Sequence, residues 1–337
     1  MRVCFVEPPI DRQGGGLGIA IRSLCHALSK ENVSVMGETA LEESGHIDVV
    51  HFHALWEPRH WWLSRRCRTL GVPYVVSPHG MLEPWAWRDK QWKKLPYFHL
   101  FERARLAAAR ALLATSETEA RNLRALLPTA RVVAIPLGLS GDARAGYAEA
   151  RQKLGWGADE RILVFLSRIH RKKGLDLLVQ ALEGRTEGRL VIVGSGEASY
   201  VASLRDLCLN RVGRLPRIEW VGEVLGEARW PYLQGADLFC LPSHSENFGL
   251  AVLEACQVGT PVLTSTQTPW GEALTGRPGF ICQPTVESIR VALDQFWSKP
   301  LASPEERAAL ADWAWATFSW KTLAPRYVEF YATLANS

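Results

Sequence analysis

Two glutamates eight positions apart are the residues best suited to chemistry. Glu246 lies in a loop after an apolar strand, and Glu254 lies inside a helix that begins near Gly249. Apolar residues flank Glu254, and burying a carboxylate among them is unfavourable unless something donates hydrogen bonds to it. Sugar hydroxyls would do so. A surface position or an ion pair with a buried arginine would also satisfy the carboxylate, and the sequence leaves these alternatives open.

A basic loop precedes these glutamates. Four basic side chains follow the apolar stretch 162–166: Arg168, Arg171, Lys172 and Lys173. Ligands of α/β proteins bind at the carboxyl ends of strands, and guanidinium and ammonium groups at that position suit a polyanion such as a diphosphate. The alternative is an ordinary solvated basic loop.

Two glycine-rich loops could bring backbone N–H groups close to a phosphate. One contains Gly14, Gly15 and Gly16 between a strand and a helix, and the other contains Gly194 and Gly196 after a later strand. Such N–H groups can hold a phosphate, although either loop could equally be a tight turn. The first loop does not fit G-x-G-x-x-G, because its sixth position is isoleucine in either register. A nicotinamide-dependent oxidoreductase is therefore disfavoured.

Strand and helix patterns alternate along the chain, which is typical of an α/β protein with parallel sheets. The first series of expected strands is 3–6, 48–52, 74–77, 111–115 and 131–135. The second series is 162–166, 190–193, 218–221, 238–241 and 262–264. A helix is expected at 17–28, and Ser116 with Glu119 forms a capping-box pattern that opens another. The two series predict two Rossmann-like domains.

The domains are expected at residues 1–142 and 158–318. Residues 138–157 hold five glycines and only a short helical pattern near 145–154, which predicts a hinge. Residues 305–334 are expected to be helical, with a large aromatic face.

Composition excludes several classes of protein. With 337 residues, 47% of them hydrophobic, each domain can have its own core, and a disordered or collagen-like chain is excluded. The seven cysteines are scattered and never spaced C-x-x-C, so neither a disulfide framework nor a structural zinc site is expected, and a cytoplasmic location is favoured. The sequence lacks a run of about 18 apolar residues, so we expect neither a signal peptide nor a membrane span.

Basic and tryptophan residues are concentrated in residues 51–110. This segment has 11 Lys or Arg against 4 Asp or Glu, a net charge of 11 − 4 = +7, and 6 of the 14 tryptophans. Within it, Trp85, Trp87, Lys93 and Lys94 could stack on sugar rings, bind an anionic acceptor or rest on an anionic membrane. Alternatively, the aromatic side chains pack inside the domain and the charges form a solvated face. A nucleic-acid partner is not expected, because no recognition motif accompanies the charge.

Taken together, these motifs resemble the retaining glycosyltransferases of the group 1 or family 4 type. The resemblance rests on the Gly14–Gly16 loop, Ser77-Pro78-His79-Gly80-Met81-Leu82, Arg168 with Lys173-Gly174, Gly194-Ser195-Gly196, and Glu246 and Glu254 around Asn247-Phe248-Gly249. It implies the GT-B architecture, in which two Rossmann-like domains with parallel sheets face a central cleft. The first domain would bind the acceptor, the second would bind a nucleotide sugar, and a C-terminal helix at 319–337 would cross back to the first domain.

The resemblance also implies roles for single residues. Arg168 and Lys173 would hold the donor diphosphate, and Glu254 the nucleotide ribose. Glu246 would hold the donor sugar, and His79 would lie near the transferred sugar unless it is merely a turn residue that caps a helix. The other implied donor-binding residues are Gly15, Gly16, Gly194, Gly196, Asn247, Phe248, Gly249 and Leu250.

The implied reaction moves a sugar from a nucleoside diphosphate, UDP in preference to GDP, to a hydroxyl of a saccharide or glycolipid. The leaving diphosphate needs a nearby cation. The ten aspartates include no D-x-D pair, so we expect Arg168, Lys173 and helix N-termini to supply the positive charge, with no metal and no cofactor. Attack from the front face, assisted by the departing phosphate oxygen, would retain the anomeric configuration.

The resemblance places the protein in the assembly of cell-surface polysaccharide or lipopolysaccharide. We expect a cytoplasmic protein, and the sequence leaves open peripheral contact with the cytoplasmic face of an anionic membrane. The leading alternative is a non-catalytic protein that binds a nucleotide sugar on the same scaffold. An oxidoreductase and a sugar phosphorylase or epimerase of related architecture are the further alternatives.

Overall fold

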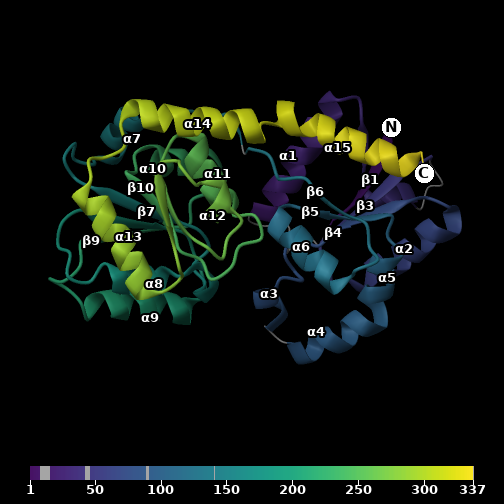
Figure 1. The fold of residues 1–337 in the computed structure, drawn as a ribbon, viewed down its shortest axis with the longest axis horizontal. Helices are drawn as coiled ribbons and strands as arrows, with labels where there is room; N and C mark the ends of the chain where they lie inside the picture. The colour runs from purple at the N-terminus through teal and green to yellow at the C-terminus, as the bar shows by residue number, and fades with distance from the viewer. Residues whose placement is uncertain (8–15, 42–45, 89–90, 140, 337) are drawn as a thin grey trace. The chain divides into compact units, whose positions relative to one another are not determined.

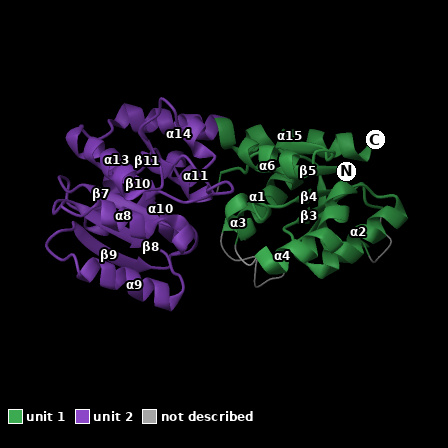
Figure 2. Ribbon diagram, turned by 60° about the horizontal axis from the view of Figure 1, so that its bottom comes forward, with its two compact units in different colours: residues 1–140, 317–337 green, residues 141–316 purple. Residues whose placement is uncertain are grey.

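The computed structural model describes residues 1–7, 16–41, 46–88, 91–139 and 141–336. The chain forms two compact units, one of residues 1–140 with 317–337 and the other of residues 141–316 (Figure 2). Each unit contains one six-stranded parallel sheet with helices packed against it (Figure 1). The α/β class and the two parallel sheets predicted from the sequence are therefore confirmed.

The first unit is built on a sheet of order β2-β1-β3-β4-β5-β6. Its strands are β1 (Arg2–Val6), β2 (Ser34–Met36), β3 (Val49–His53), β4 (Tyr74–Ser77), β5 (Ala111–Ala114) and β6 (Val132–Ala134). The chain adds β2 on one side of β1 and β3 on the other. The direction of winding therefore reverses between β1 and β3, and ligands of such sheets bind beyond the strand ends at this reversal.

Both faces of this sheet are buried, as is usual for parallel strands. Side chains alternate along β1, so that Cys4 and Val6 enter one core cluster and Val3 and Phe5 enter the other. Helices α1 (Gly16–Lys30) and α15 (Trp320–Ala335) cover the face of Phe5, while α2 (Pro58–Leu70) and α6 (Glu117–Leu126) contribute to the opposite cluster. The remaining helices of the unit are α3 (Pro84–Arg88), α4 (Gln91–Tyr97) and α5 (Arg103–Ala107), with a π-helical turn at Phe98–Glu102.

The C-terminal segment consists of two helices. The helical pattern predicted for residues 305–334 is divided into α14 (Pro304–Phe318) and α15 by Ser319, whose backbone is extended. Helix α15 packs beside α1, and its Tyr327 and Tyr331 are buried in the core of the first unit. The predicted return of the C-terminal helix to the first domain is thus confirmed.

The second unit is built on a sheet of order β12-β11-β10-β7-β8-β9. Its strands are β7 (Ile162–Leu166), β8 (Arg189–Val193), β9 (Arg217–Gly222), β10 (Leu238–Leu241), β11 (Val262–Ser265) and β12 (Gly279–Cys282). Its helices are α7 (Tyr147–Leu154), α8 (Leu175–Ala181), α9 (Ala198–Leu209), α10 (Trp230–Gln234), α11 (Leu250–Gln257), α12 (Trp270–Ala273), α13 (Val286–Ser298) and most of α14. Here the winding reverses between β7 and β10.

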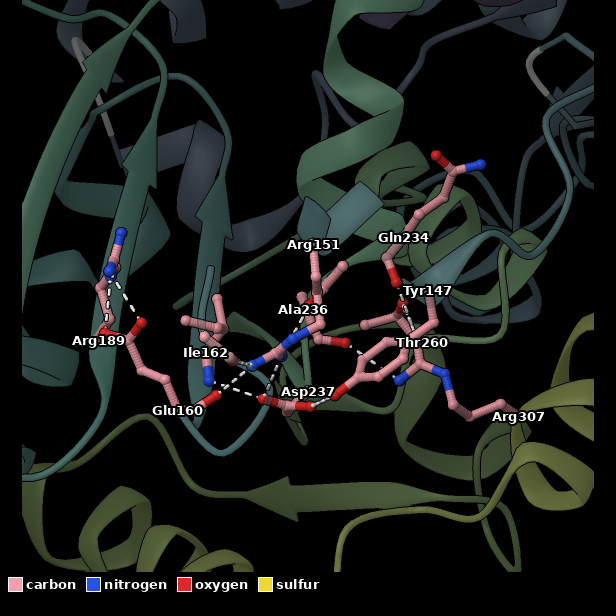
Figure 3. A network of polar contacts seen from close by, with 12 residues as sticks. Tyr147, Arg151, Glu160, Ile162, Arg189, Gln234, Ala236, Asp237, Thr260 and Arg307 are labelled. Carbon is pink, nitrogen blue, oxygen red and sulfur yellow. Dashed lines mark hydrogen bonds and ion pairs between the residues drawn. The ribbon is translucent and has the colours of Figure 1, made fainter. Parts of the chain in front are cut away.

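Residues 141–157 belong to the second unit, although the sequence predicts a hinge at 138–157. Helix α7 packs against α10 and is anchored by the buried Asp237 (Figure 3). The Asp237 carboxylate accepts hydrogen bonds from the Tyr147 hydroxyl (2.6 Å) and the Ile162 N–H (2.7 Å), and it pairs with Arg151 (3.1 Å). This network ties the start of β7 to α7, so the compact unit begins at residue 141 and not at 158.

Candidate functional site

The loops after β7 and β10 lie against each other at the reversal point of the second sheet. The His244 N–H donates to the Lys172 carbonyl oxygen at 2.8 Å. Gly174 has φ +68°, and a Cβ at this position would lie only 2.4 Å from the carbonyl oxygen of Pro242. Glycine is therefore required here both by backbone conformation and by the close approach of the second loop.

Lys173 and Glu246 meet in this contact. The Lys173 Nζ atom lies 2.6 Å from Oε1 of Glu246, and the Ser243 hydroxyl donates to the same oxygen at 2.7 Å. The Glu246 side chain is 7% exposed and that of Lys173 is 16% exposed. The fold thus brings together two predicted site residues that are 73 positions apart, and holds the ammonium group at the strand ends where a polyanion can reach it.

Arg168 lies in the same loop as Lys173 and is exposed. The described residues provide it with no hydrogen bond or ion pair. The neighbouring Arg171 is engaged differently, because its guanidinium group lies 4.7 Å from the centre of the Tyr200 ring. Arg168 is therefore an exposed cation of this loop that is available to an external anion.

The glycines after β8 allow two loops to touch. A Cβ at Gly194 would lie 1.9 Å from the carbonyl oxygen of Ser167, and one at Gly196 would lie 2.0 Å from that of Ile169. The Ile169 N–H also donates to the Ser195 carbonyl oxygen at 2.7 Å. These glycines are required by packing against the loop that carries Arg168, so they position the basic loop whether or not they also contact a ligand.

Glu254 is buried and paired with an arginine. Its Oε1 accepts a hydrogen bond from Nη2 of Arg229 at 2.9 Å, and the two side chains are 7% and 10% exposed. Of the alternatives that the sequence left open, the ion pair with a buried arginine is therefore present. A sugar hydroxyl is not needed to explain the burial of Glu254.

The residues between the two glutamates form a rigid turn. Gly249 has φ +81° and precedes α11, which begins at Leu250. The Phe248 carbonyl oxygen accepts a hydrogen bond from the Trp270 indole N–H, and the two rings pack edge to face at 5.3 Å. Phe248 is therefore a packing residue, whereas Asn247 and Leu250 are half-buried beside it.

In the first unit, His79 follows β4 in a tight turn. His79 has φ +52°, which is uncommon for a residue with a side chain, and Gly80 has φ +74°. The buried Glu119 carboxylate pins this turn, since it accepts from the Gly80 N–H at 2.6 Å and from the Thr115 N–H at 2.8 Å. Burial raises the pKa of Glu119 to about 7. The Ser116 hydroxyl accepts from the Glu119 N–H, as the capping pattern predicts.

The His79 ring is held by a second histidine that sequence reasoning missed. Nε2 of His79 lies 3.0 Å from Nδ1 of His53, at the end of β3. A signal was present, because Val-Val-His-Phe-His places two histidines on one face of an otherwise apolar strand. Arg229 and Ser243 were also missed, and neither carries a local signal that identifies its glutamate partner. Gly15 lies outside the described residues, and Gly16 is the exposed first residue of α1.

The basic, tryptophan-rich segment is partly core and partly surface. Trp87 stacks on Trp56 at 5.8 Å and packs against the first core cluster, and Trp85 is half-buried. The Lys94 ammonium donates to the Ala86 carbonyl oxygen at 2.6 Å. By contrast, Trp92 is 74% exposed, and the Lys93 ammonium lies 4.8 Å from the centre of its ring.

Two further searches cover only the part of the chain that the structure describes. No three His, Cys, Asp or Glu side chains in those ranges are grouped so that they could hold a metal ion. Among the described helices, none combines the length and the apolar character needed to cross a bilayer.

Comparisons with solved structures place the protein in a fold class. The chain is similar to sucrose-phosphate synthase (tll1590) from Thermosynechococcus elongatus, with a TM-score of 0.84, 20% identity and 100% of both chains covered. It is also similar to Anabaena Alr3699/HepE in complex with UDP, with a TM-score of 0.76, 16% identity, and 99% of this chain and 100% of that chain covered. These similarities show that the protein has the GT-B fold.

Sequence comparisons identify the family. The family model "Glycosyl transferases group 1" matches residues 147–314, and "Glycosyltransferase Family 4" matches residues 38–141. A protein of Actinosynnema mirum named D-inositol 3-phosphate glycosyltransferase is 30% identical over 268 residues, which cover 74% of this chain and 63% of that protein. The chain thus spans less than two thirds of this curated relative. It belongs to the group 1 glycosyltransferases.

Proposed function

We propose that this protein transfers a sugar from a nucleoside diphosphate to a hydroxyl group of a saccharide or glycolipid, with retention of configuration and without a metal ion. The observation that carries the proposal is the Lys173–Glu246 pair, in the same loop system as the exposed Arg168, where the second sheet reverses its winding. One cation held in place and a second one available to an external anion suit a diphosphate leaving group.

UDP is the nucleotide we favour over GDP. Support comes from structural relatives whose solved structures contain UDP or UDP-glucose, namely those of Anabaena Alr3699/HepE. Their sequence identity to this chain is 16–18%, so the nucleotide is part of the proposal. The curated relatives named D-inositol 3-phosphate glycosyltransferase support transfer to a hydroxyl of a polar acceptor.

In the proposed reaction, the bond between the anomeric carbon and the phosphate oxygen breaks on the same face on which the acceptor oxygen attacks. The acceptor proton passes to the departing phosphate oxygen, so a separate protein base is not required. Arg168 and Lys173 stabilise the charge that develops on the diphosphate. Glu246 and the turn at Asn247 contact the donor sugar, Glu254 binds the ribose, and His79 contacts the transferred sugar.

Binding measurements test the donor site first. Calorimetry with UDP, GDP and ADP in the presence of EDTA is expected to show tightest binding of UDP, weakened at least tenfold in R168A. The matched control is R171A, which removes the same charge from the same loop but takes away a guanidinium group that stacks on Tyr200. Equal weakening in R168A and R171A would mean that the loop acts only through its general charge, and the diphosphate assignment would be wrong.

Turnover tests the chemistry. R168A is expected to lower kcat about 100-fold, since removing one preorganised group that stabilises transition-state charge typically has this effect. The anomeric configuration of the product, measured by NMR, should match that of the donor, and activity should survive EDTA. An inverted product refutes retention, and EDTA-sensitive transfer refutes metal independence. UDP binding without transfer to any acceptor would favour a non-catalytic nucleotide-sugar-binding protein.

The surface of α4 suggests where an anionic glycolipid is presented. Arg88, Gln91, Trp92 and Leu95 line an open groove of about 590 Å³, and the amphipathic pair of Trp92 with Lys93 suits the interface of an anionic membrane. We propose that the protein works in the cytoplasm, at the membrane surface where cell-surface polysaccharide or lipopolysaccharide is assembled. Sedimentation with vesicles that contain anionic lipid should carry the wild-type protein down and leave W92A/K93A in solution. Equal sedimentation of both proteins would refute this surface.

A further inference from the structure

Three histidine rings cluster at the carboxyl end of the first sheet, of which His51 and His53 are buried and His79 is half-buried. His51 and His53 are 0% and 1% exposed, and both point to the face covered by α1 and α15. Their rings lie 3.9 Å apart, and that of His53 is also 4.8 Å from the Phe5 ring. His79 joins the cluster from the turn after β4. The three rings border a small cavity of about 10 Å³, room for about one water molecule.

The hydrogen bonds of His51 and His53 differ. Both ring nitrogens of His51 have partners, since Nδ1 lies 2.8 Å from the Tyr331 hydroxyl and Nε2 lies 2.8 Å from the Ser77 hydroxyl. His53 uses only Nδ1, toward His79, and its buried Nε2 has no hydrogen-bond partner among the described residues. A buried nitrogen without a protein partner is unfavourable, and the cavity that His53 borders has room for a water molecule to pair with it.

The His53–His79 contact links the protonation states of the two rings. Burial lowers the pKa of His79 to about 4 and that of His53 well below its usual range, so both rings are neutral near pH 7. Between two neutral imidazoles one nitrogen must donate and the other must accept. The contact therefore couples the tautomer of His79 to that of His53. It also engages Nε2, while Nδ1 of His79 has no partner among the described residues.

The two restraints on His79 come from different elements. Glu119 holds the backbone of the turn through the Gly80 N–H, and His53 holds the ring, with the two imidazole planes inclined by only 13°. The positive φ of His79 shows that the turn is kept in an unfavourable conformation, which persists only where surrounding contacts enforce it. The side chain that results is rigid and presents one ring nitrogen.

We propose that His53 is a positioning residue for His79. It holds Nε2 of His79, couples the tautomer of that ring to its own, and leaves Nδ1 as the nitrogen that contacts the donor sugar. This inference rests on the proposed function of His79. It adds a role for His53 and names Nδ1 as the nitrogen of His79 that contacts the sugar.

The test compares three substitutions at one position. H53L removes the contact. H53N places an amide close to the position of Nδ1 and can still pair with Nε2 of His79, whereas the longer H53Q places its amide near the position of Nε2 and cannot. We expect kcat to fall about 10- to 100-fold in H53L and H53Q, the effect of a misplaced contact group, with KM for the nucleotide sugar within about twofold. H53N should recover most of the kcat.

Y331F is the matched structural control, because it removes a hydrogen bond of His51 and leaves His53 intact. It should lower Tm but leave kcat unchanged. If H53L lowers Tm as Y331F does and retains its kcat, His53 is only structural and the inference is wrong. A drop in kcat that H53N and H53Q share equally would also overturn it.

A second readout does not need activity. In ¹⁵N NMR spectra the two ring nitrogens of His79 should report a different ratio of the two tautomers in H53L than in the wild type. An unchanged ratio in H53L overturns the inference. A protein that neither binds UDP nor transfers a sugar, but shows this tautomer change, would refute the proposed function and retain the structural relation between His53 and His79.

Discussion

Replacing Gly174 by alanine tests whether the loops after β7 and β10 brace each other. Gly174 has φ +68°, and the new Cβ would lie 2.4 Å from the carbonyl oxygen of Pro242, where ordinary contact begins near 3.4 Å. The obstacle is a backbone atom and not the end of a flexible side chain. The two loops must therefore separate by about 1 Å (3.4 − 2.4) to admit the methyl group.

Two terms set the size of the effect. Alanine in a left-handed conformation costs about 1–2 kcal/mol, and forcing an extra methyl group into a packed contact costs about 1–3 kcal/mol. G174A should lower the free energy of unfolding by the sum, about 2–5 kcal/mol. G213A provides the control, because Gly213 has φ +79° and nothing lies within 4 Å of its Cβ position. G213A should therefore lose only the cost of alanine in a left-handed conformation, about 1–2 kcal/mol.

Urea denaturation of both variants measures the difference, and UDP calorimetry shows its consequence. Separating the loops by about 1 Å would lengthen the 2.6 Å contact between Lys173 and Glu246 beyond hydrogen-bond range. UDP affinity should fall at least tenfold in G174A and stay unchanged in G213A. If G174A unfolds within about 0.5 kcal/mol of G213A and binds UDP equally well, the loops are not braced and the reasoning is refuted.

Three further predictions concern ionisable side chains. D237L should lower the free energy of unfolding by about 3–5 kcal/mol in urea denaturation, because it leaves Arg151 buried without its partner, and R151M/D237L should recover part of that loss. Burial lowers the pKa of His79 in the folded protein from 6.5 to about 4. The free energy of unfolding should therefore decrease by about 1.4 kcal/mol per pH unit as the pH falls from 6.5 to about 4, and H79Q should lack this pH dependence. The pKa of Glu119 is raised from 4.5 to about 7, so its contribution has the opposite direction: stability falls as pH rises through that window, and E119Q should abolish the slope. Identical pH profiles of the wild type and the variant would contradict either titration.

The sequence predicts the central strands well because their burial leaves a strong signal. The apolar runs at β7, β8 and β10 are buried on both faces, and the predicted ranges agree with the observed ones to within a residue. The edge strands β2 and β12 were missed. They are only three and four residues long and are largely half-exposed or exposed, so their residues carry little of the pattern that identifies a strand.

The sequence predicts those site residues that follow a recognisable strand, but not their partners from distant parts of the chain. Lys173 and Glu246 follow neighbouring strands, and parallel strands bring their carboxyl ends to one edge, so their meeting could be expected. The pairing of Arg229 with Glu254 could not be expected from the sequence. Arg229 lies 25 residues before Glu254, in a short 3₁₀ turn, and which charged side chains pair depends on how the helices pack. His53 differs again: its signal was visible, but it has meaning only once β4 places His79 beside β3.

The Lys173–Glu246 pair implies a competition that can be measured. A diphosphate bound to Lys173 brings further negative charge to an ammonium group that already lies 2.6 Å from a carboxylate. Two unit charges about 6 Å apart repel by about 3 kcal/mol at an effective dielectric constant of 20, and solvent and salt reduce this value.

Glutamine at position 246 keeps an oxygen that can accept from Lys173, so the ammonium group stays in place, but the negative charge is lost. E246Q should therefore bind UDP about 3- to 10-fold more tightly in calorimetry, while kcat falls because the contact of the carboxylate with the donor sugar is weakened. E197Q, which changes an exposed carboxylate after β8, should alter neither quantity. If UDP instead binds E246Q more weakly, the carboxylate serves mainly to hold Lys173 in place. In that case the pair is part of the binding site as a unit, and the argument from competition fails.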